Sequence, residues 1–165
     1  MSFTLAAPTG ATGAARYADL HQALQGLLDG ERDLLANTAN MAALVFHLLP
    51  DLNWAGWYFL RGQQLVLGPF QGKPACVRID MGRGVCGTAA LSRQSVRVSD
   101  VHAFPGHIAC DAASRSELVV PALRADGSLL GVFDLDSPLL ARFTTEDQQG
   151  IENAVRALLL ASDCG

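Results

Sequence analysis

Apolar residues recur at helical spacing in three segments of the chain. The first covers residues 17–28, and the second runs from about residue 31 until Pro50 stops it. The third begins at Thr144, where Asp147 follows three residues later and forms a variant capping box. An apolar stripe with a period of three to four residues is typical of a helix that packs on a core. The pattern therefore predicts two helices near the N-terminus and one at the C-terminus.

Between these helices, short apolar or alternating runs predict β-strands that are separated by turns. The predicted strands cover residues 52–60, 63–70, 75–79, 96–98, 117–123 and 129–135. A glycine-rich turn at Gly82 opens a short helix between the third and fourth strands, and residues 99–115 form a long irregular segment. Because hairpins dominate, we expect an α+β domain with a mainly antiparallel sheet. Residues 1–15 are expected to be a flexible N-terminal tail, and residues 16–163 a single domain.

Composition and charge narrow the classes of function. Half of the 165 residues are apolar, 17% are charged and the net charge is −4, with no basic run. Nucleic acid is therefore an unexpected partner. The N-terminus does not resemble a signal peptide, and no apolar stretch approaches the ~20 residues that span a bilayer. We expect a soluble, cytoplasmic protein with no membrane association.

Cysteine is the most informative residue type in the composition. Cys76, Cys86 and Cys110 lie within one part of the chain, and Cys164 is next to the C-terminus. Burial as small apolar residues is one interpretation of these cysteines. A zinc site made by the first three with His107 is another, but their separations of nine and 23 residues contain no C-x₂₋₄-C pair, so no metal is predicted. Thiol redox chemistry, with an attacking and a resolving cysteine, fits better, and Cys164 is interpreted as a bystander.

Acidic residues form a second candidate cluster. Asp134 and Asp136 lie two apart at the end of a strand, so they share one face. A turn explains Asp136 but explains Asp134 poorly, because Asp134 lies within the strand. Glu117, which opens the neighbouring strand, and Asp100, which starts the long loop, can join them. Such a cluster can hold an ammonium group, or donate a proton where burial keeps one acid neutral.

Several motifs together resemble those of the free methionine-(R)-sulfoxide reductases, which are small stand-alone GAF domains. The matching segments are NWAGWYFL, GPFQGKPAC, GRGVCGTAA, DVHAFPGHIACDAASRSE and GVFDLDSP. The resemblance covers residues from about 20 to 160. It implies a GAF-like fold, with the N- and C-terminal helices on one face of the sheet and the ligand pocket on the other. It also implies reduction of free L-methionine (R)-S-oxide by a homodimer without a bound cofactor, with thioredoxin (or dithiothreitol in vitro) as the reductant.

The resemblance also implies roles for individual residues. Cys110 matches the attacking cysteine, and Cys76 and Cys86 match the cysteines of disulfide formation, in an order that stays open. Trp54 and Tyr58, which the pattern alone assigns to simple core packing, match the pocket for the methylthio end. The acids around the substrate are matched by Asp100, Glu117, Asp134 and Asp136.

The chemistry of sulfoxide reduction suggests how these residues divide the work. Departure of the sulfoxide oxygen needs a proton donor, for which we expect Glu117 with Asp136 as helper. Asp134 and Asp100 are expected to hold the substrate ammonium. Cys110 becomes a sulfenic acid and then forms a disulfide. The alternative is a non-catalytic GAF domain that senses a small ligand or the redox state, since the fold hosts many binding functions.

Overall fold

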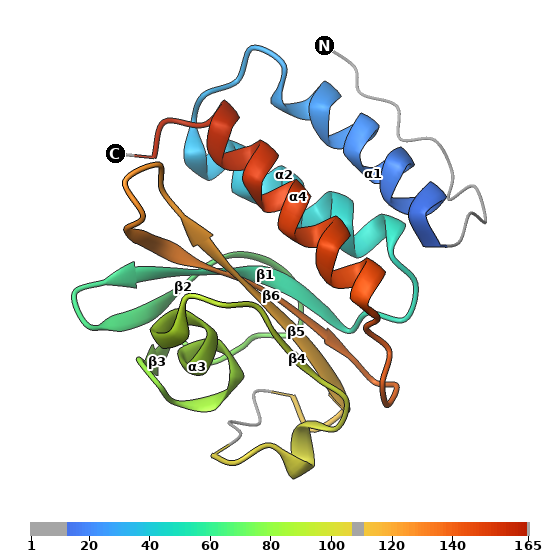
Figure 1. The fold of residues 1–165 in the computed structure, drawn as a ribbon, viewed down its shortest axis with the longest axis vertical. Coiled ribbons are helices and arrows are strands. Elements are labelled where there is room, and N and C mark those ends of the chain that lie inside the picture. The colour runs from blue at the N-terminus through green and yellow to red at the C-terminus, as the bar shows by residue number, and fades with distance from the viewer. Residues whose placement is uncertain (1–12, 107–110, 165) are drawn as a thin grey trace.

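The computed structural model describes residues 13–106 and 111–164. Six strands form one sheet in the order β3-β2-β1-β6-β5-β4, and every neighbouring pair is antiparallel (Figure 1). The strands are β1 (Trp54–Arg61), β2 (Gln64–Gly72), β3 (Arg78–Asp80), β4 (Val96–Val98), β5 (Ser116–Leu123) and β6 (Leu129–Ser137). The predicted order of elements and the antiparallel sheet are therefore confirmed.

Three helices cover one face of the sheet, as predicted. They are α1 (Gly13–Leu28), α2 (Leu34–Leu48) and α4 (Thr145–Ala161). The capping box at Thr144 is present, with the Thr144 and Asp147 side chains each accepting from the other's backbone N–H. Helix α1 begins at Gly13, so residues 13–15 form its first turn instead of belonging to the expected tail. Residues 1–12 of that tail lie outside the described residues.

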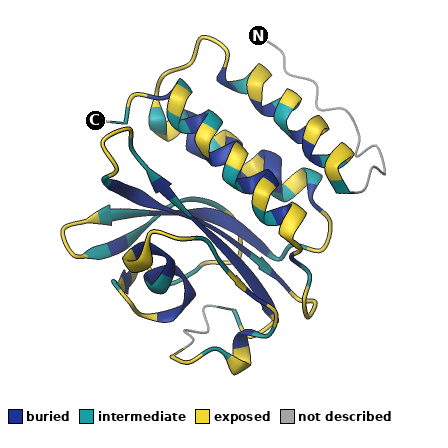
Figure 2. Cartoon of the chain, in the orientation of Figure 1, coloured by how far each residue is buried: buried dark blue, intermediate teal, exposed yellow. Residues whose placement is uncertain are grey.

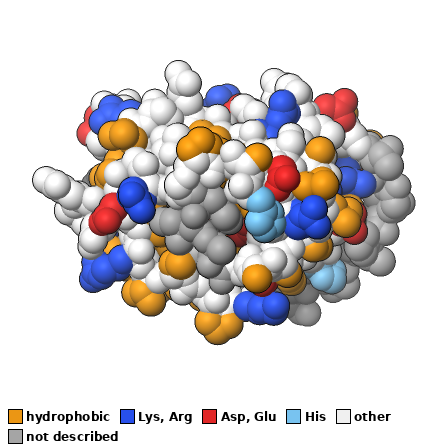
Figure 3. Space-filling model, turned by 90° about the horizontal axis from the view of Figure 1, so that it is seen from below, with side chains coloured by type: hydrophobic (Ala, Val, Ile, Leu, Met, Phe, Trp, Pro, Cys, Tyr) orange, Lys and Arg blue, Asp and Glu red, His pale blue; other side chains and the backbone are white. Residues whose placement is uncertain are grey.

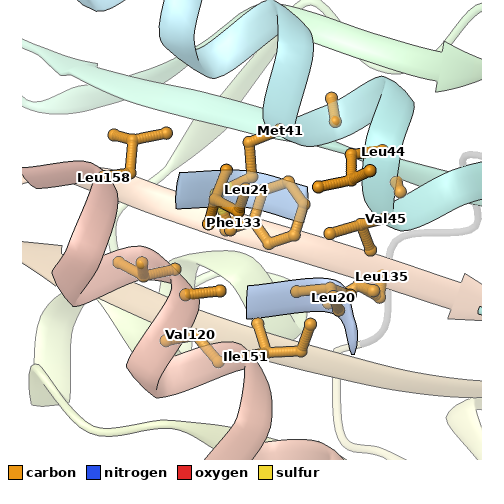
Figure 4. Close-up of a cluster of buried hydrophobic side chains, with 14 of the residues drawn as sticks. Leu20, Leu24, Met41, Leu44, Val45, Val120, Phe133, Leu135, Ile151 and Leu158 are labelled. Atoms are coloured by element: carbon orange, nitrogen blue, oxygen red, sulfur yellow. The ribbon is translucent and has the colours of Figure 1, made fainter. Parts of the chain in front are cut away.

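The larger hydrophobic core lies between these helices and the sheet. Figure 2 shows the helices buried on the side that faces the sheet and exposed on the other. Figure 4 shows this core, with Leu20 and Leu24 from α1 packed among side chains of α2, α4 and the central strands. From the sheet, Trp57 and Phe133 point into it, with ring centroids 4.8 Å apart. This packing confirms the prediction that the helices at both ends of the chain cover one face of the sheet.

A smaller hydrophobic cluster lies on the opposite face of the sheet, beneath helix α3 (Gly84–Ser92). Residues of β1 alternate between the faces, so Trp54 and Tyr58 belong to this second cluster whereas Trp57 belongs to the first. Gly87 allows α3 to pack tightly, since a Cβ there would lie 2.4 Å from the Asp80 carbonyl oxygen. This second face, which combines an apolar cluster with acidic side chains, carries the candidate site.

The remaining segments add little regular structure. The described part of the long irregular segment contains one 3₁₀ turn, η1 (Val101–Ala103). In the described part of the chain, no helix is both long and apolar enough to cross a membrane. On the face that Figure 3 shows, basic and acidic side chains are interspersed, and neither forms a continuous patch.

Candidate functional site

A small cavity of about 30 Å³ lies on the face of the sheet opposite α1, α2 and α4. Its described walls are formed by Trp54, Tyr58, Lys73, Pro74, Ala75, Ile79, Arg83, Gly84, Val85, Cys86, Asp111, Ser114, Glu117, Asp134 and Asp136. That volume holds only about two or three water molecules. A free amino acid is larger than this volume.

Strand register brings three of the predicted site residues into one row across the sheet. Asp136 on β6 is directly opposite Trp54 on β1 and Glu117 on β5. Side chains directly opposite in antiparallel strands lie on the same face and within contact range. Asp134, two residues before Asp136, also lines the cavity. The predicted common face of the two aspartates is thus confirmed, and Glu117 joins them through β5.

Aromatic rings form one wall of the cavity. The Trp54 ring stacks on Tyr58 and Phe70, with centroids 5.8 Å and 5.4 Å apart. Gly56 makes room for this stack, because a Cβ there would lie 2.3 Å from Phe70 Cβ and 2.6 Å from Trp54 Cη2. The Trp54 indole donates to the Lys73 carbonyl oxygen at 3.1 Å, which fixes the ring orientation. These fixed apolar faces suit a methyl or thioether group.

The acids beside this wall are deeply buried. Glu117 and Asp134 each expose only 6% of their surface. Loss of hydration raises the pKa of Glu117 well above its ordinary range, and the charges of Asp134 and Asp136 raise it further. Desolvation likewise raises the pKa of Asp136, with the Asp134 charge adding to the shift and a hydrogen bond with Ser114 opposing it. At neutral pH the cluster therefore retains protons.

Asp134 is the most acidic member of this cluster. Desolvation raises its pKa to about 7, but hydrogen bonds with Cys86 and Glu117 stabilise its charged form. Glu117 is thus the better proton donor and Asp134 the better anion. Carboxyl groups whose environments separate their pKa values in this way are typical of acid–base sites.

Cys86 extends the cluster from the first turn of α3. Its thiol is free and buried, and its Sγ lies 3.9 Å from Glu117 Oε1. Desolvation raises the pKa of Cys86, and the neighbouring charge of Asp134 raises it further. The helix N-terminus, which favours a thiolate, does not offset this burial. Cys86 is therefore a thiol, not a thiolate, in this state.

The other predicted cysteines lie differently. Cys76 is partly buried beside the second hydrophobic cluster and is disulfide-bonded, and its carbonyl oxygen accepts from the Tyr58 hydroxyl at 3.0 Å. Cys110, the expected attacking residue, lies outside the described residues. Cys164 is a free thiol near the end of the chain. The cysteines thus separate into one buried in the cavity wall, one bonded at its edge and one remote.

Asp100, like Cys76, is a predicted site residue that does not line the cavity among the described residues. Its side chain caps η1 by accepting from the His102 backbone N–H at 3.0 Å and contacts the His102 ring. That backbone N–H holds the pKa of Asp100 below its ordinary value. Asp100 is therefore charged, and its role in substrate binding stays a prediction.

Sequence reasoning missed the polar contacts that join two edges of the cavity. Lys73 Nζ lies 3.4 Å from Asp111 Oδ2, and Asn53 donates to Asp111 and to Ser114 at 3.3 and 3.0 Å. The Lys73 contact connects the segment that carries Cys76 with the segment that follows Cys110, and the Asn53 contacts connect that second segment with the start of β1. The sequence feature that could have indicated the Lys73 contact is proximity, because Lys73 and Asp111 are each close in sequence to a candidate cysteine.

Comparison with known proteins identifies the class to which this fold and pocket belong. Residues 19–161 match the GAF domain family. A relative in Escherichia coli, named free methionine-R-sulfoxide reductase, is 54% identical over 142 residues, which cover 86% of each chain. One of the same name in Saccharomyces cerevisiae is 42% identical, over 81% of this chain and 78% of that protein.

A solved structure agrees with these relatives. The free methionine-R-sulfoxide reductase of Neisseria meningitidis, in complex with its substrate, superposes with a TM-score of 0.91 and 39% identity, covering 97% of this chain and 95% of that one. The chain therefore belongs to the free methionine-R-sulfoxide reductase family of GAF domains.

Proposed function

We propose that this protein reduces free L-methionine (R)-S-oxide to L-methionine. The observation that carries the proposal is the cavity wall itself, in which a protonated Glu117 and the more acidic Asp134 lie beside the stacked Trp54 and Tyr58 rings. A zwitterionic sulfoxide offers a group to each of these side chains. Family membership supports the same activity.

The substrate would be held by both of its ends. Trp54 and Tyr58 contact the methylthio group, and Asp134 accepts from the ammonium with support from Asp100. A hydrogen bond to a charged group is worth about 1.5–3 kcal/mol, so a free amino group is a strong recognition feature. A peptide-bound methionine sulfoxide lacks that ammonium and is expected to be excluded.

Reduction then proceeds through the thiol of Cys110. The Cys110 thiolate attacks the sulfoxide sulfur while Glu117, assisted by Asp136, protonates the oxygen. The oxygen passes to the cysteine, so methionine leaves and a sulfenic acid remains on Cys110. A second cysteine thiol condenses with the sulfenic acid, which forms a disulfide and releases water. An external dithiol returns both cysteines to thiols.

Cys76 is the better candidate for the resolving cysteine. It is disulfide-bonded, whereas Cys86 is a buried free thiol whose pKa is raised. Resolution requires a nucleophilic, accessible sulfur. We therefore assign the disulfide to Cys76 and Cys110 and place Cys86 outside this first step.

The activity is tested with a mixture of free methionine sulfoxide epimers and dithiothreitol. We expect loss of the R epimer alone, no turnover of N-acetylated substrate, and no turnover in Cys110→Ser. The matched control is Cys164→Ser, which lies away from the cavity and is expected to retain full activity. Binding of the substrate without turnover by the reduced wild type would support a sensor and contradict the proposal.

The resolving step is tested by mass mapping after one turnover. Cys76→Ser is expected to release one methionine and to retain a sulfenic acid that dimedone labels, whereas Cys86→Ser is expected to form the normal disulfide. The opposite result would assign resolution to Cys86.

The reductant and the assembly complete the proposal. We infer that thioredoxin is the reductant, that the enzyme is a homodimer, and that it acts in the cytoplasm, where disulfide turnover is sustained by reducing systems. Light scattering measures the dimer, and NADPH consumption coupled through thioredoxin reductase measures the recycling. A monomer would contradict the proposed homodimer. Turnover with dithiothreitol but not with thioredoxin would contradict the proposed reductant.

A further inference from the structure

Three buried side chains from three elements converge at the floor of the cavity. Cys86 comes from α3, Glu117 from β5 and Asp134 from β6. One ligand atom from each lies within 4.8 Å of the corresponding atoms of the other two. The Cys86 Sγ to Glu117 Oε1 distance is 3.9 Å. A tetrahedral zinc site with Zn–S of about 2.3 Å and Zn–O of about 2.1 Å places sulfur and oxygen about 3.6 Å apart.

A second, independent observation concerns the Asp134 carboxylate. Asp134 Oδ1 has no hydrogen-bond partner among the described residues, although the Asp134 side chain is buried and lines the cavity. A buried carboxylate oxygen without a partner is costly. No lysine or arginine forms an ion pair with Glu117 or Asp134 within residues 13–106 and 111–164. A cation in the cavity would supply the partner that Asp134 Oδ1 lacks.

We propose that the reduced protein binds one Zn²⁺, or a transition metal of similar preference, through Cys86 Sγ and the carboxylates of Glu117 and Asp134. A thiolate with two carboxylates is a donor set that zinc accepts and that magnesium and calcium do not favour. The protons of the Cys86 thiol and of the Glu117 carboxyl group leave to solvent when the metal binds. A water molecule takes the fourth position, for which a cavity of about 30 Å³ has room.

The metal and an amino acid substrate would compete for the same cavity. The cavity of about 30 Å³ has room for a metal ion with one bound water, and the metal occupies the two carboxyl groups that the substrate needs. We therefore expect zinc to inhibit turnover reversibly. Reduction of the enzyme's disulfide by the external dithiol is expected to be unaffected. This inhibition rests on the proposed function, whereas metal binding does not.

Binding is measured without turnover. Protein reduced with a non-chelating phosphine is titrated with Zn²⁺ in a calorimeter and with Co²⁺ in a spectrophotometer. We expect one metal ion per chain and a near-ultraviolet thiolate-to-Co²⁺ charge-transfer band. Cys86→Ser is expected to lose the band and to weaken zinc binding by more than about tenfold.

Controls separate this site from the other thiols. Cys76→Ser and Cys164→Ser are expected to retain the charge-transfer band and the wild-type affinity. If Cys86→Ser does not fold, Asp134→Asn takes its place and is expected to weaken metal binding. A band that persists in Cys86→Ser but disappears in Cys76→Ser or Cys110→Ser would overturn the proposal. Zinc binding without inhibition of turnover would retain the site and contradict the proposed function of the cavity.

Discussion

Glu117 and Asp134 are neighbours in one cavity, yet their surroundings separate their acidities. Both lose hydration, which raises both pKa values. Hydrogen bonds from Cys86 and Glu117 stabilise the charged Asp134, whereas the charges of Asp134 and Asp136 oppose ionisation of Glu117. The proposed roles of proton donor and ammonium partner are thereby divided between two residues of the same chemical type.

Removal of the Glu117 proton tests this division. Glu117→Gln keeps the shape of the side chain but cannot release a proton to the sulfoxide oxygen. We expect kcat to fall by about 10²–10⁴-fold while KM changes little. Steady-state assays with the R epimer measure this effect. Glu146→Gln, on the exposed first turn of α4, is the matched control and should behave like wild type. A large change in KM with unaltered kcat would assign Glu117 to binding.

Asp134→Asn should have the complementary effect. It removes the anion that we propose as the partner of the ammonium, and we expect KM to rise by about tenfold to 100-fold with a smaller change in kcat. The preference for free over N-acetylated methionine sulfoxide should also decrease. Competition between the two substrates measures this preference. Unchanged discrimination in the variant would locate ammonium recognition elsewhere.

At the scale of elements, the sequence predicts most of the fold because one apolar period dominates each segment. The stripes of α1, α2 and α4 and the alternation in β6 were sufficient to locate the helices and to place Asp134 and Asp136 on one face. The register that sets Asp136 between Trp54 and Glu117 could not be predicted, since it depends on long-range strand pairing. The buried position of Cys86 likewise depends on how α3 packs over the sheet.

The contact between Lys73 and Asp111 is another long-range feature without a sequence signal. It joins the segment that carries Cys76 to the one that follows Cys110. The Lys73 side chain is 71% exposed, so the ion pair is worth no more than about 1 kcal/mol. Its effect should therefore be on the probability of bringing two cysteines together, not on stability.

Lys73→Met is expected to slow disulfide formation after one turnover by up to about fivefold. The backbone acceptor for Trp54 is retained, so substrate binding should change little. Rapid-quench labelling of free thiols measures the rate. Arg78→Met removes a comparable exposed charge on β3 and provides the control. An equal effect of both substitutions would indicate a general loss of charge.

At the scale of the molecule, the two faces of the sheet have different tasks. The face under α1, α2 and α4 buries a continuous apolar core (Figure 4). The other face carries three carboxyl groups whose pKa values are raised, two buried and one, Asp136, partly buried. A raised pKa means that the folded state binds protons more tightly than the unfolded state, so these groups destabilise the folded protein as they ionise. The candidate site thus lowers the free energy of unfolding, and the apolar core on the opposite face offsets this loss.

The free energy of unfolding should record this cost as a pH dependence. The unfolded pKa of Asp134 is about 3.9, and its folded value is about 7. Between these pH values the folded state binds more protons than the unfolded state. The contribution of Asp134 to the free energy of unfolding is therefore greatest below about pH 4, and it is lost as the pH rises through about 7. Asp134→Asn removes the titration and should stabilise the protein by about 1–3 kcal/mol at neutral pH, with the gain vanishing in acid. Urea unfolding of the reduced protein at several pH values measures both curves. Parallel curves for the variant and the wild type would show that Asp134 titrates normally, and the separation of roles between Asp134 and Glu117 would then lose its physical basis.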